Sequence, residues 1–93
     1  MAIRSFRCAD TQRLFETGKS ARWANIRKVA ERKLQQLDSA ETLAFLKSPP
    51  GNSLEALSHD RAGQHSIRIN DQWRVCFVWT PAGPEDVEIC DYH

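Results

Sequence analysis

The stretch HSIRINDQWRVCFVW, residues 65–79, alternates between apolar and polar side chains and decides the fold. Ile67 and Ile69 alternate with polar residues, and every second residue of 73–79 is large and apolar. Because successive side chains of a β-strand point to opposite faces, this period of two predicts two strands. The polar run Asn-Asp-Gln at 70–72 joins them into a hairpin with one apolar face.

The length of the turn fixes which residues of the two strands face each other. A two-residue loop would set Ile67 against Arg74 and scramble the apolar face, so the pattern excludes it. A three-residue loop at 70–72 sets Ile67 against Val75 and Arg68 directly opposite Arg74. The alternation therefore predicts two neighbouring arginines on the face that does not carry the apolar residues.

The predicted arginine pair indicates an anion-binding site. Like charges directly opposed across two strands are destabilising, and an anion between Arg68 and Arg74 would remove the repulsion. A guanidinium group suits phosphate because its fork donates two parallel hydrogen bonds. The alternative is that each arginine pairs with a local acid such as Glu88.

The clearest helix is predicted over residues 21–38, with Ser20 as its N-cap. Its apolar residues recur at steps of three and four, which places them on one helical face against the core. These residues are Trp23, Ile26, Ala30, Leu34 and Leu37.

Shorter elements precede and follow this helix. A short strand is predicted over residues 2–7, with Ile3 facing inward. A short helix follows, with Asp10 or Thr11 as its N-cap and Gly18 as its end. A further helical turn is predicted over residues 41–47, before the sequence Pro-Pro-Gly-Asn breaks the chain.

A final strand is marked by Val87 and Ile89 and runs to the end of the sequence. If both residues face the core, alternation places Tyr92 on the same face as the arginine pair. Asp91 and His93 then point to the core side, unless the strand bends there.

The predicted order is therefore strand, helix, helix and three strands. This order is typical of an α+β fold, in which a small antiparallel sheet carries the N-terminal helices on one face. A length of 93 residues fits one domain, residues 1–93.

Composition narrows the class of protein. No stretch approaches the ~20 apolar residues of a membrane span, and the opening MAIRSF lacks the apolar run of a signal peptide. We therefore expect a cytoplasmic protein without a membrane partner. The three cysteines, Cys8, Cys76 and Cys90, are too few and too far apart for a disulfide framework or a zinc site, so reduced, packed thiols are expected.

The net charge of +1 conceals an uneven distribution. Residues 1–33 carry nine Lys or Arg against three acids, whereas residues 34–93 carry four against nine. A basic first half indicates an anionic partner, although a solvated helix surface explains the same charge equally well.

The sequence ends in Asp91-Tyr92-His93, three side chains that handle protons in different ways. Imidazole titrates near neutral pH and serves as acid or base. A tyrosine hydroxyl can donate to a phosphate oxygen, and an aspartate can orient the imidazole. RNA supplies its own nucleophile, the 2′-hydroxyl, so such a triplet with arginines could cut RNA without metal. Taken alone, however, the triplet is better explained as the polar end of a strand.

Several motifs together resemble one family. They are SPPGNSLEAL at 48–57, DRAGQHSIRINDQWR at 60–74 and VEICDYH at 87–93, with IRSF at 3–6 and VAERKL at 29–34 in support. The chain closely resembles the HigB (host inhibition of growth) toxins of the RelE/ParE superfamily, over essentially its whole length.

The resemblance implies a RelE-like fold and a toxin of a type II toxin–antitoxin pair. Such toxins cleave mRNA in the A site of the translating 70S ribosome by metal-free acid–base catalysis, without a cofactor, and stop translation and growth. The expected partners are the ribosome, mRNA and a HigA-like helix-turn-helix antitoxin. Contact with operator DNA is expected only through that antitoxin.

The family's site residues transfer where they match. Asp91, Tyr92 and His93 match the family's ending, and Arg74 matches its strand arginine, with Arg68 added from the register. Glu55 and Ser58 depart from it, because some relatives carry His and Lys there, so the general base is open between Glu55 and the terminal triplet. Basic residues of the first half become candidates for contacts with RNA phosphates, namely Arg4, Arg7, Arg22, Arg27, Lys28 and Arg32.

Two other functions remain open. The chain could act by binding alone, either as a ParE-like inhibitor of a topoisomerase or as a co-repressor with its antitoxin. It could also be a toxin without activity, since Glu55 and Ser58 replace residues found in some relatives.

Overall fold

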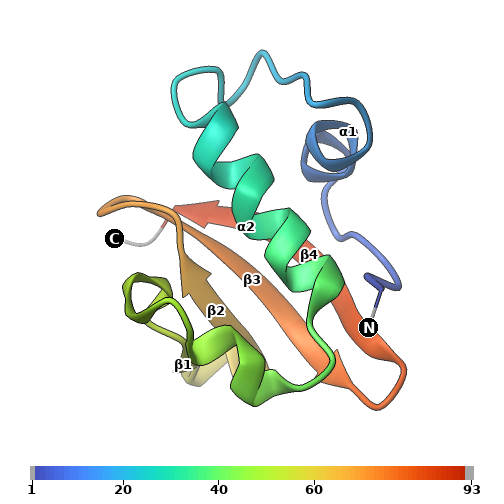
Figure 1. The fold of residues 1–93 in the computed structure, drawn as a ribbon, viewed down its shortest axis with the longest axis vertical. Coiled ribbons are helices and arrows are strands. Elements are labelled where there is room, and N and C mark those ends of the chain that lie inside the picture. The colour runs from blue at the N-terminus through green and yellow to red at the C-terminus, as the bar shows by residue number, and fades with distance from the viewer. Residues whose placement is uncertain (1, 92–93) are drawn as a thin grey trace.

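A four-stranded antiparallel sheet forms the centre of the structure, a computed structural model that describes residues 2–91. The strands β1 (Glu55–Ala56), β2 (His65–Arg68), β3 (Trp73–Thr80) and β4 (Gly83–Asp91) lie side by side in this order (Figure 1). The predicted α+β class is therefore confirmed.

Two helices, α1 (Ala9–Thr17) and α2 (Arg27–Ser39), pack on one face of the sheet. Figure 1 shows α2 crossing in front of the strands, with α1 beside it near β4. Three short 3₁₀ turns lie between α2 and β2. They are η1 (Leu43–Lys47), η2 (Pro50–Asn52) and η3 (His59–Arg61).

The core lies between the helices and the apolar face of the sheet. Val75 and Phe77 of β3 are completely buried there, as are Leu14 of α1 and Leu34 of α2. Trp23 is also buried and meets Trp73 edge to face, with ring centroids 6.2 Å apart. Apart from Leu14, these are residues that the predicted alternation and helical spacing turn inward.

The hairpin register is the one that a three-residue loop predicts. Ile67 lies opposite Val75 and Arg68 opposite Arg74. The side chain of Asn70 closes the turn, because its Oδ1 accepts the backbone N–H groups of Gln72 at 2.9 Å and Trp73 at 2.8 Å. This arrangement is a typical Asx turn, and it holds the two strands in register.

The predicted strand at residues 2–7 is wrong. These residues run extended beside β4 and form only an isolated parallel bridge between Phe6 and Val87. Three backbone hydrogen bonds join this segment to β4, and Ile3 and Phe6 are half-buried against the core, but too few consecutive residues are paired to make a strand. The first strand of the sheet is instead β1, in the segment that follows the Pro-Pro-Gly-Asn break.

The predicted start of the long helix at residue 21 is also wrong, because α2 begins at Arg27. Residues 21–26 form turns, with Ser20 Oγ accepting from the Trp23 N–H at 3.0 Å and an i→i+3 bond from Ile26 N to the Trp23 carbonyl. A spacing of three between Trp23 and Ile26 fits such a turn as well as a helix. The apolar pattern alone therefore could not separate the two.

The end of α1 agrees with the sequence, but its start does not. Gly18 ends α1 in the left-handed conformation, with φ of 72°. The N-cap is Cys8, neither Asp10 nor Thr11. Thr11 is buried inside the first turn, where its hydroxyl accepts the Ile89 N–H at 3.1 Å and ties α1 to β4.

Neither helix within residues 2–91 has the length and apolar character needed to cross a membrane.

Candidate functional site

The second face of the sheet, called the polar face below, carries charged and small polar side chains. Alternation along each strand turns these side chains away from the helices. They are Glu55 of β1, Ser66 and Arg68 of β2, Arg74 and Cys76 of β3, and Glu88 and Cys90 of β4.

Arg74 lies at the centre of the polar face and is almost completely buried, with 4% of its surface exposed. Its Nε donates to Ser66 Oγ at 2.6 Å, and its Nη2 donates to the carbonyls of Ser66 and Ser53. The same Nη2 lies 3.9 Å from Oε2 of Glu55. The guanidinium group is therefore fixed in one orientation beside a carboxylate that is only half-buried.

Arg68 lies directly opposite Arg74 but turns toward the hairpin turn, where its Nη2 lies 2.5 Å from Oδ1 of Asp71. Each arginine thus has its own acid. The alternative, in which each arginine pairs with a local acid, is therefore confirmed. The acids are Asp71 for Arg68 and Glu55 for Arg74. Glu88 pairs elsewhere.

The loop that supplies the Ser53 carbonyl to Arg74 is held by a buried asparagine. Asn52 is completely buried, and its Oδ1 accepts from Nζ of Lys33 at 2.5 Å. Its Nδ2 is within hydrogen-bond distance of the Leu46 carbonyl, the Ser48 carbonyl and Oε1 of Gln36. The network joins α2 to the loop, so that the loop's position depends on the helix.

Lys33 is the charged member of this network. Burial lowers the pKa of its ammonium group below the ordinary value, and the nearby charges of Arg32 and Arg68 lower it further. The cost of burying the charge is partly offset by the bond to Asn52.

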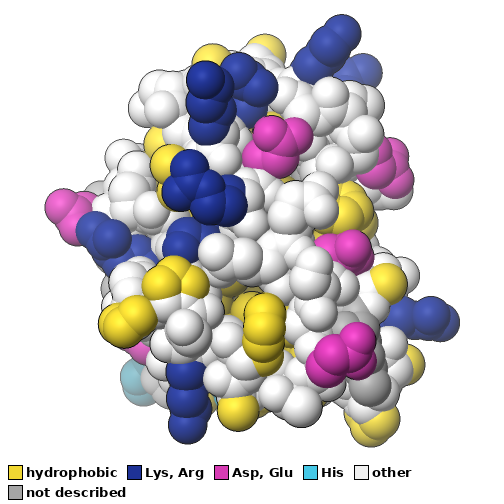
Figure 2. Space-filling view, viewed as in Figure 1, with side chains coloured by type: hydrophobic (Ala, Val, Ile, Leu, Met, Phe, Trp, Pro, Cys, Tyr) yellow, Lys and Arg dark blue, Asp and Glu magenta, His cyan; other side chains and the backbone are white. Residues whose placement is uncertain are grey.

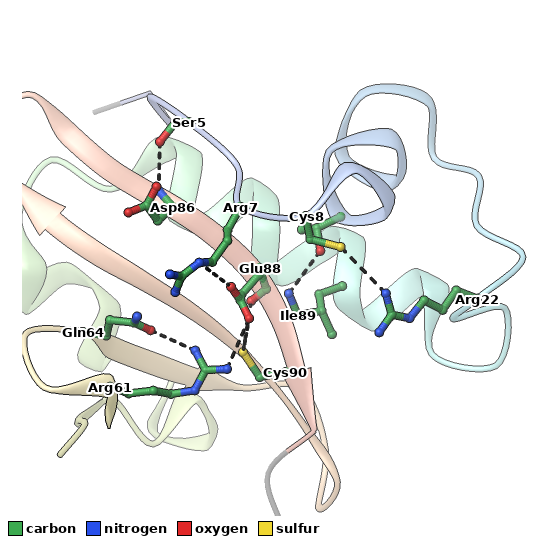
Figure 3. Close-up of polar contacts among 11 residues, drawn as sticks. Ser5, Arg7, Cys8, Arg22, Arg61, Gln64, Asp86, Glu88, Ile89 and Cys90 are labelled. Atoms are coloured by element: carbon green, nitrogen blue, oxygen red, sulfur yellow. Dashed lines mark hydrogen bonds and ion pairs between the residues drawn. The ribbon is translucent and has the colours of Figure 1, made fainter. Parts of the chain in front are cut away.

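A second cluster on the polar face was not anticipated from the sequence. Figure 3 shows Arg7 and Arg61 pointing at the carboxylate of Glu88 from opposite sides. Arg61 Nη2 lies 3.2 Å from Oε1, and Arg7 Nε lies 3.6 Å from Oε2. Arg61 also donates to Oε1 of Gln64 at 3.1 Å. The only sequence signal was the alternation that places Glu88 on this face.

The two cysteines of the polar face lie beneath this cluster. Cys76 and Cys90 are buried and free, and Cys90 Sγ lies 3.3 Å from Oε1 of Glu88. A hydrogen bond between the two thiols lowers the pKa of Cys76 and raises that of Cys90. Cys8 is also free and packs against the core, so the predicted packing of all three cysteines is confirmed. In the described part of the chain, no three His, Cys, Asp or Glu side chains are gathered to hold a metal ion.

Asp91 ends β4 and is the last residue that the structure describes. Its Cα is paired with Trp73, whose indole packs against the core, so alternation puts Asp91 on the helix side. The side chain is exposed, and its Oδ2 accepts from Nε2 of Gln72 at 3.3 Å. The predicted site residues Tyr92 and His93 lie outside the described residues.

The six candidate RNA-binding residues do not gather on one surface. Arg7 lies at the polar face, whereas Arg22 and Arg27 hold the segment between α1 and α2. Arg22 pairs with Asp10 at 3.3 Å and lies over the ring of Trp23 at 4.6 Å, and Arg27 donates to the Gly18 carbonyl at 3.1 Å. The other three are exposed, namely Arg4, Lys28 and Arg32.

Figure 2 looks onto the helix side of the molecule and shows several Lys and Arg side chains over α2 and the connection before it. This cationic surface and the polar face lie on different sides of the sheet. The cations of the basic first half are therefore divided between two surfaces, and of the six candidates only Arg7 lies at the polar face with Arg74 and Glu55.

The sequence matches a family model over residues 4–93, and that family is described as the RelE-like toxin of the type II toxin–antitoxin system HigB. The chain belongs to the HigB-like toxin family. The sequence motifs at 48–57, 60–74 and 87–93 lie within the matched span, and the α+β fold is consistent with this family.

Two curated relatives are similar to part of the chain. The chain is 46% identical to Toxin HigB-1 of Vibrio cholerae serotype O1 over 48 residues, which are 52% of this chain and 50% of that protein. It is 39% identical to an uncharacterized protein of Haemophilus influenzae over 56 residues, which are 60% of this chain and 55% of the relative. The chain thus spans about half the length of the curated relatives that it matches.

Proposed function

We propose that this HigB-like chain is an endoribonuclease that cuts mRNA in the A site of the ribosome and so stops translation. The observation that carries the proposal is the pairing of Arg74 with Glu55 on the polar face. A fixed cation beside a half-exposed carboxylate offers electrostatic stabilisation and a proton acceptor at one place.

The proposed reaction uses the 2′-hydroxyl of RNA as its nucleophile. Glu55 takes the proton from that hydroxyl, and the oxygen then attacks the adjacent phosphorus. The bond from phosphorus to the 5′-oxygen breaks, and Tyr92 or His93 supplies a proton to the leaving oxygen. The products are a 2′,3′-cyclic phosphate and a 5′-hydroxyl end.

The two strand arginines have different parts in this mechanism. Arg74 stabilises the charge that develops on the phosphorane, because its orientation is set before substrate binds. Arg68 is more exposed and its partner Asp71 is fully solvated, so it can exchange that partner for a phosphate oxygen. Asp91 and His93 are the alternative acid–base pair, with His93 as the general base.

The proposed partners follow from the family. A HigA-like helix-turn-helix antitoxin would neutralise the chain, and the complex would reach operator DNA through the antitoxin. The 70S ribosome would present the mRNA, and the exposed cations Arg4, Lys28 and Arg32 are candidates for contacts with ribosomal RNA. Arg22 and Arg27 are weaker candidates, because contacts within the chain already use their guanidinium groups.

One observation favours a second function, in which the chain only binds its target. Arg74 is buried and bonded to Ser53 and Ser66, which also suits an arginine that serves the fold alone. In that case the chain would block a topoisomerase in the manner of the ParE branch, or would act as a co-repressor with its antitoxin.

Mapping of RNA ends distinguishes the two functions. After brief expression of the chain in bacteria, new 5′-hydroxyl ends should appear inside translated codons. They should be absent for Arg74→Lys and for a variant that lacks residues 91–93, while both variants remain folded by circular dichroism. Growth arrest with intact mRNA and halted DNA replication would instead support the binding function.

A further inference from the structure

The cluster of Arg7, Arg61 and Glu88 has an excess of positive charge that its own acid cannot balance. Two guanidinium groups meet one carboxylate, so these three side chains together carry one unit of positive charge. The carboxylate of Glu88 is 17% exposed, whereas the side chains of Arg61 and Arg7 are 36% and 58% exposed. The cations therefore face solvent while the acid lies beneath them.

Neither arginine is saturated by its contacts. A guanidinium group has five N–H donors. Within residues 2–91, the Arg61 group makes two hydrogen bonds, one to Gln64 and one to Glu88. The contact of Arg7 with Glu88 at 3.6 Å is an ion pair too long for a hydrogen bond. Both guanidinium groups can therefore donate to an additional anion without first breaking their contacts with Glu88.

The position of Arg61 links this cluster to the Glu55 site. A groove of about 520 Å³ is lined by residues 55–61, so it includes the candidate base Glu55 and also Arg61. Its volume falls within the range of small-ligand sites, which is roughly 300–1,000 Å³. A single strand of RNA that places a 2′-hydroxyl at Glu55 and follows this groove would therefore pass Arg61.

We infer that Arg61 and Arg7 form a phosphodiester-binding site for single-stranded RNA on the polar face, with Glu88 as its internal counter-ion. Gln64 and Glu88 hold the Arg61 guanidinium in place before RNA arrives, which reduces the entropy lost on binding. Glu88 also competes with the phosphate for both arginines. The inference rests on the proposed function, because it takes the nucleic acid that is bound to be the RNA that is cut.

Arg61 as a phosphate contact and Glu88 as a competing counter-ion predict opposite effects of substitution on RNA affinity. Arg61→Ala removes a phosphate contact and should weaken binding by roughly tenfold. Glu88→Gln removes the competing anion but keeps the side-chain length and an acceptor for the Cys90 thiol, so it should strengthen binding by about threefold. Arg61→Ala should also reduce the slope of log affinity against log salt by about 0.7, the value for one contact with single-stranded nucleic acid.

The probe for this test is a short single-stranded RNA with 2′-O-methyl groups throughout, which has no nucleophile and cannot be cut. Fluorescence anisotropy gives its affinity for the full chain at several salt concentrations, without ribosomes. Arg13→Ala and Glu16→Gln on α1 make the same charge changes away from the polar face, and should leave affinity within a factor of two. Thermal melts of all variants establish that they are folded.

The outcomes separate this inference from the proposed function. Affinity that changes equally in the α1 controls and in the polar-face variants would overturn the site, as would weaker binding by Glu88→Gln. No measurable binding by the unchanged chain would overturn it as well, and an acidic protein segment would then be the better ligand. Cleavage by the unchanged chain on programmed ribosomes is measured separately, so failure of the nuclease function alone leaves the affinity result standing.

Discussion

Arg68 and Arg74 lie directly opposite each other in the β2–β3 hairpin, but different groups hold their guanidinium groups. Arg68 turns outward to Asp71, whose side chain is 99% exposed, whereas Arg74 is buried among Ser66, Ser53 and Glu55. One register thus produces two arginines in different environments.

Alanine substitution of the two arginines should have unequal effects on stability. Arg74→Ala removes charge-assisted hydrogen bonds in a buried place and should lower the free energy of unfolding by about 2–4 kcal/mol. Arg68→Ala breaks only a solvated ion pair and should change it by less than about 0.5 kcal/mol. Urea unfolding of both variants is the measurement. Equal losses would contradict the difference in burial.

Glu55→Gln tests the proposed general base. Glutamine keeps the size of the side chain but cannot take a proton, so single-turnover cleavage on programmed ribosomes should slow by roughly a hundredfold or more. Urea unfolding should show little change, because Glu55 is half-buried and 3.9 Å from Arg74. Glu16→Gln is the matched control on α1. An unchanged cleavage rate would assign the base to the Asp91-Tyr92-His93 triplet.

Lys33 should make stability depend on pH on the alkaline side of neutrality. Burial lowers its pKa in the folded state below the ordinary 10.5, so between those two pKa values the unfolded chain binds more protons. The contribution of Lys33 to the free energy of unfolding is therefore highest above pH 10.5, where Lys33 is neutral in both states. It falls as the pH decreases through the pKa of Lys33 in the folded state.

Lys33→Gln removes the titrating group but keeps a donor for Asn52. As pH rises from neutral toward 10.5, the unchanged chain should gain free energy of unfolding relative to this variant in urea unfolding. A constant difference between the two proteins over that range would show that the pKa of Lys33 is not lowered by folding.

Gly18 is required at the end of α1 by its backbone conformation. Its φ of 72° is strained for any residue with a Cβ, and that Cβ would lie 2.8 Å from Oε2 of Glu31. Gly18→Ala should therefore lower the free energy of unfolding by about 1–2 kcal/mol. Gly51→Ala is the control, because nothing lies within 4 Å of a Cβ there. Comparable losses from both would point to a general effect of removing glycine.

Local patterns explain which parts of the fold could be predicted. The alternation through residues 65–79 predicted the hairpin, its three-residue turn and the opposed arginines. The helical spacing predicted the buried residues Trp23 and Leu34, although not the start of α2. Boundaries failed where a turn and a helix produce the same spacing, as between Trp23 and Ile26.

The sequence by itself determined the β2–β3 hairpin, its register and the face on which the arginines lie. These features follow from a period of two and from the length of one turn, which are local properties of the chain. Only the tertiary structure decided which groups meet on that face. Glu88 and Arg61 are separated by 27 positions, and they meet because the loop carrying η3 folds over the sheet. Such long-range contacts depend on packing of the whole chain, and no local pattern encodes them.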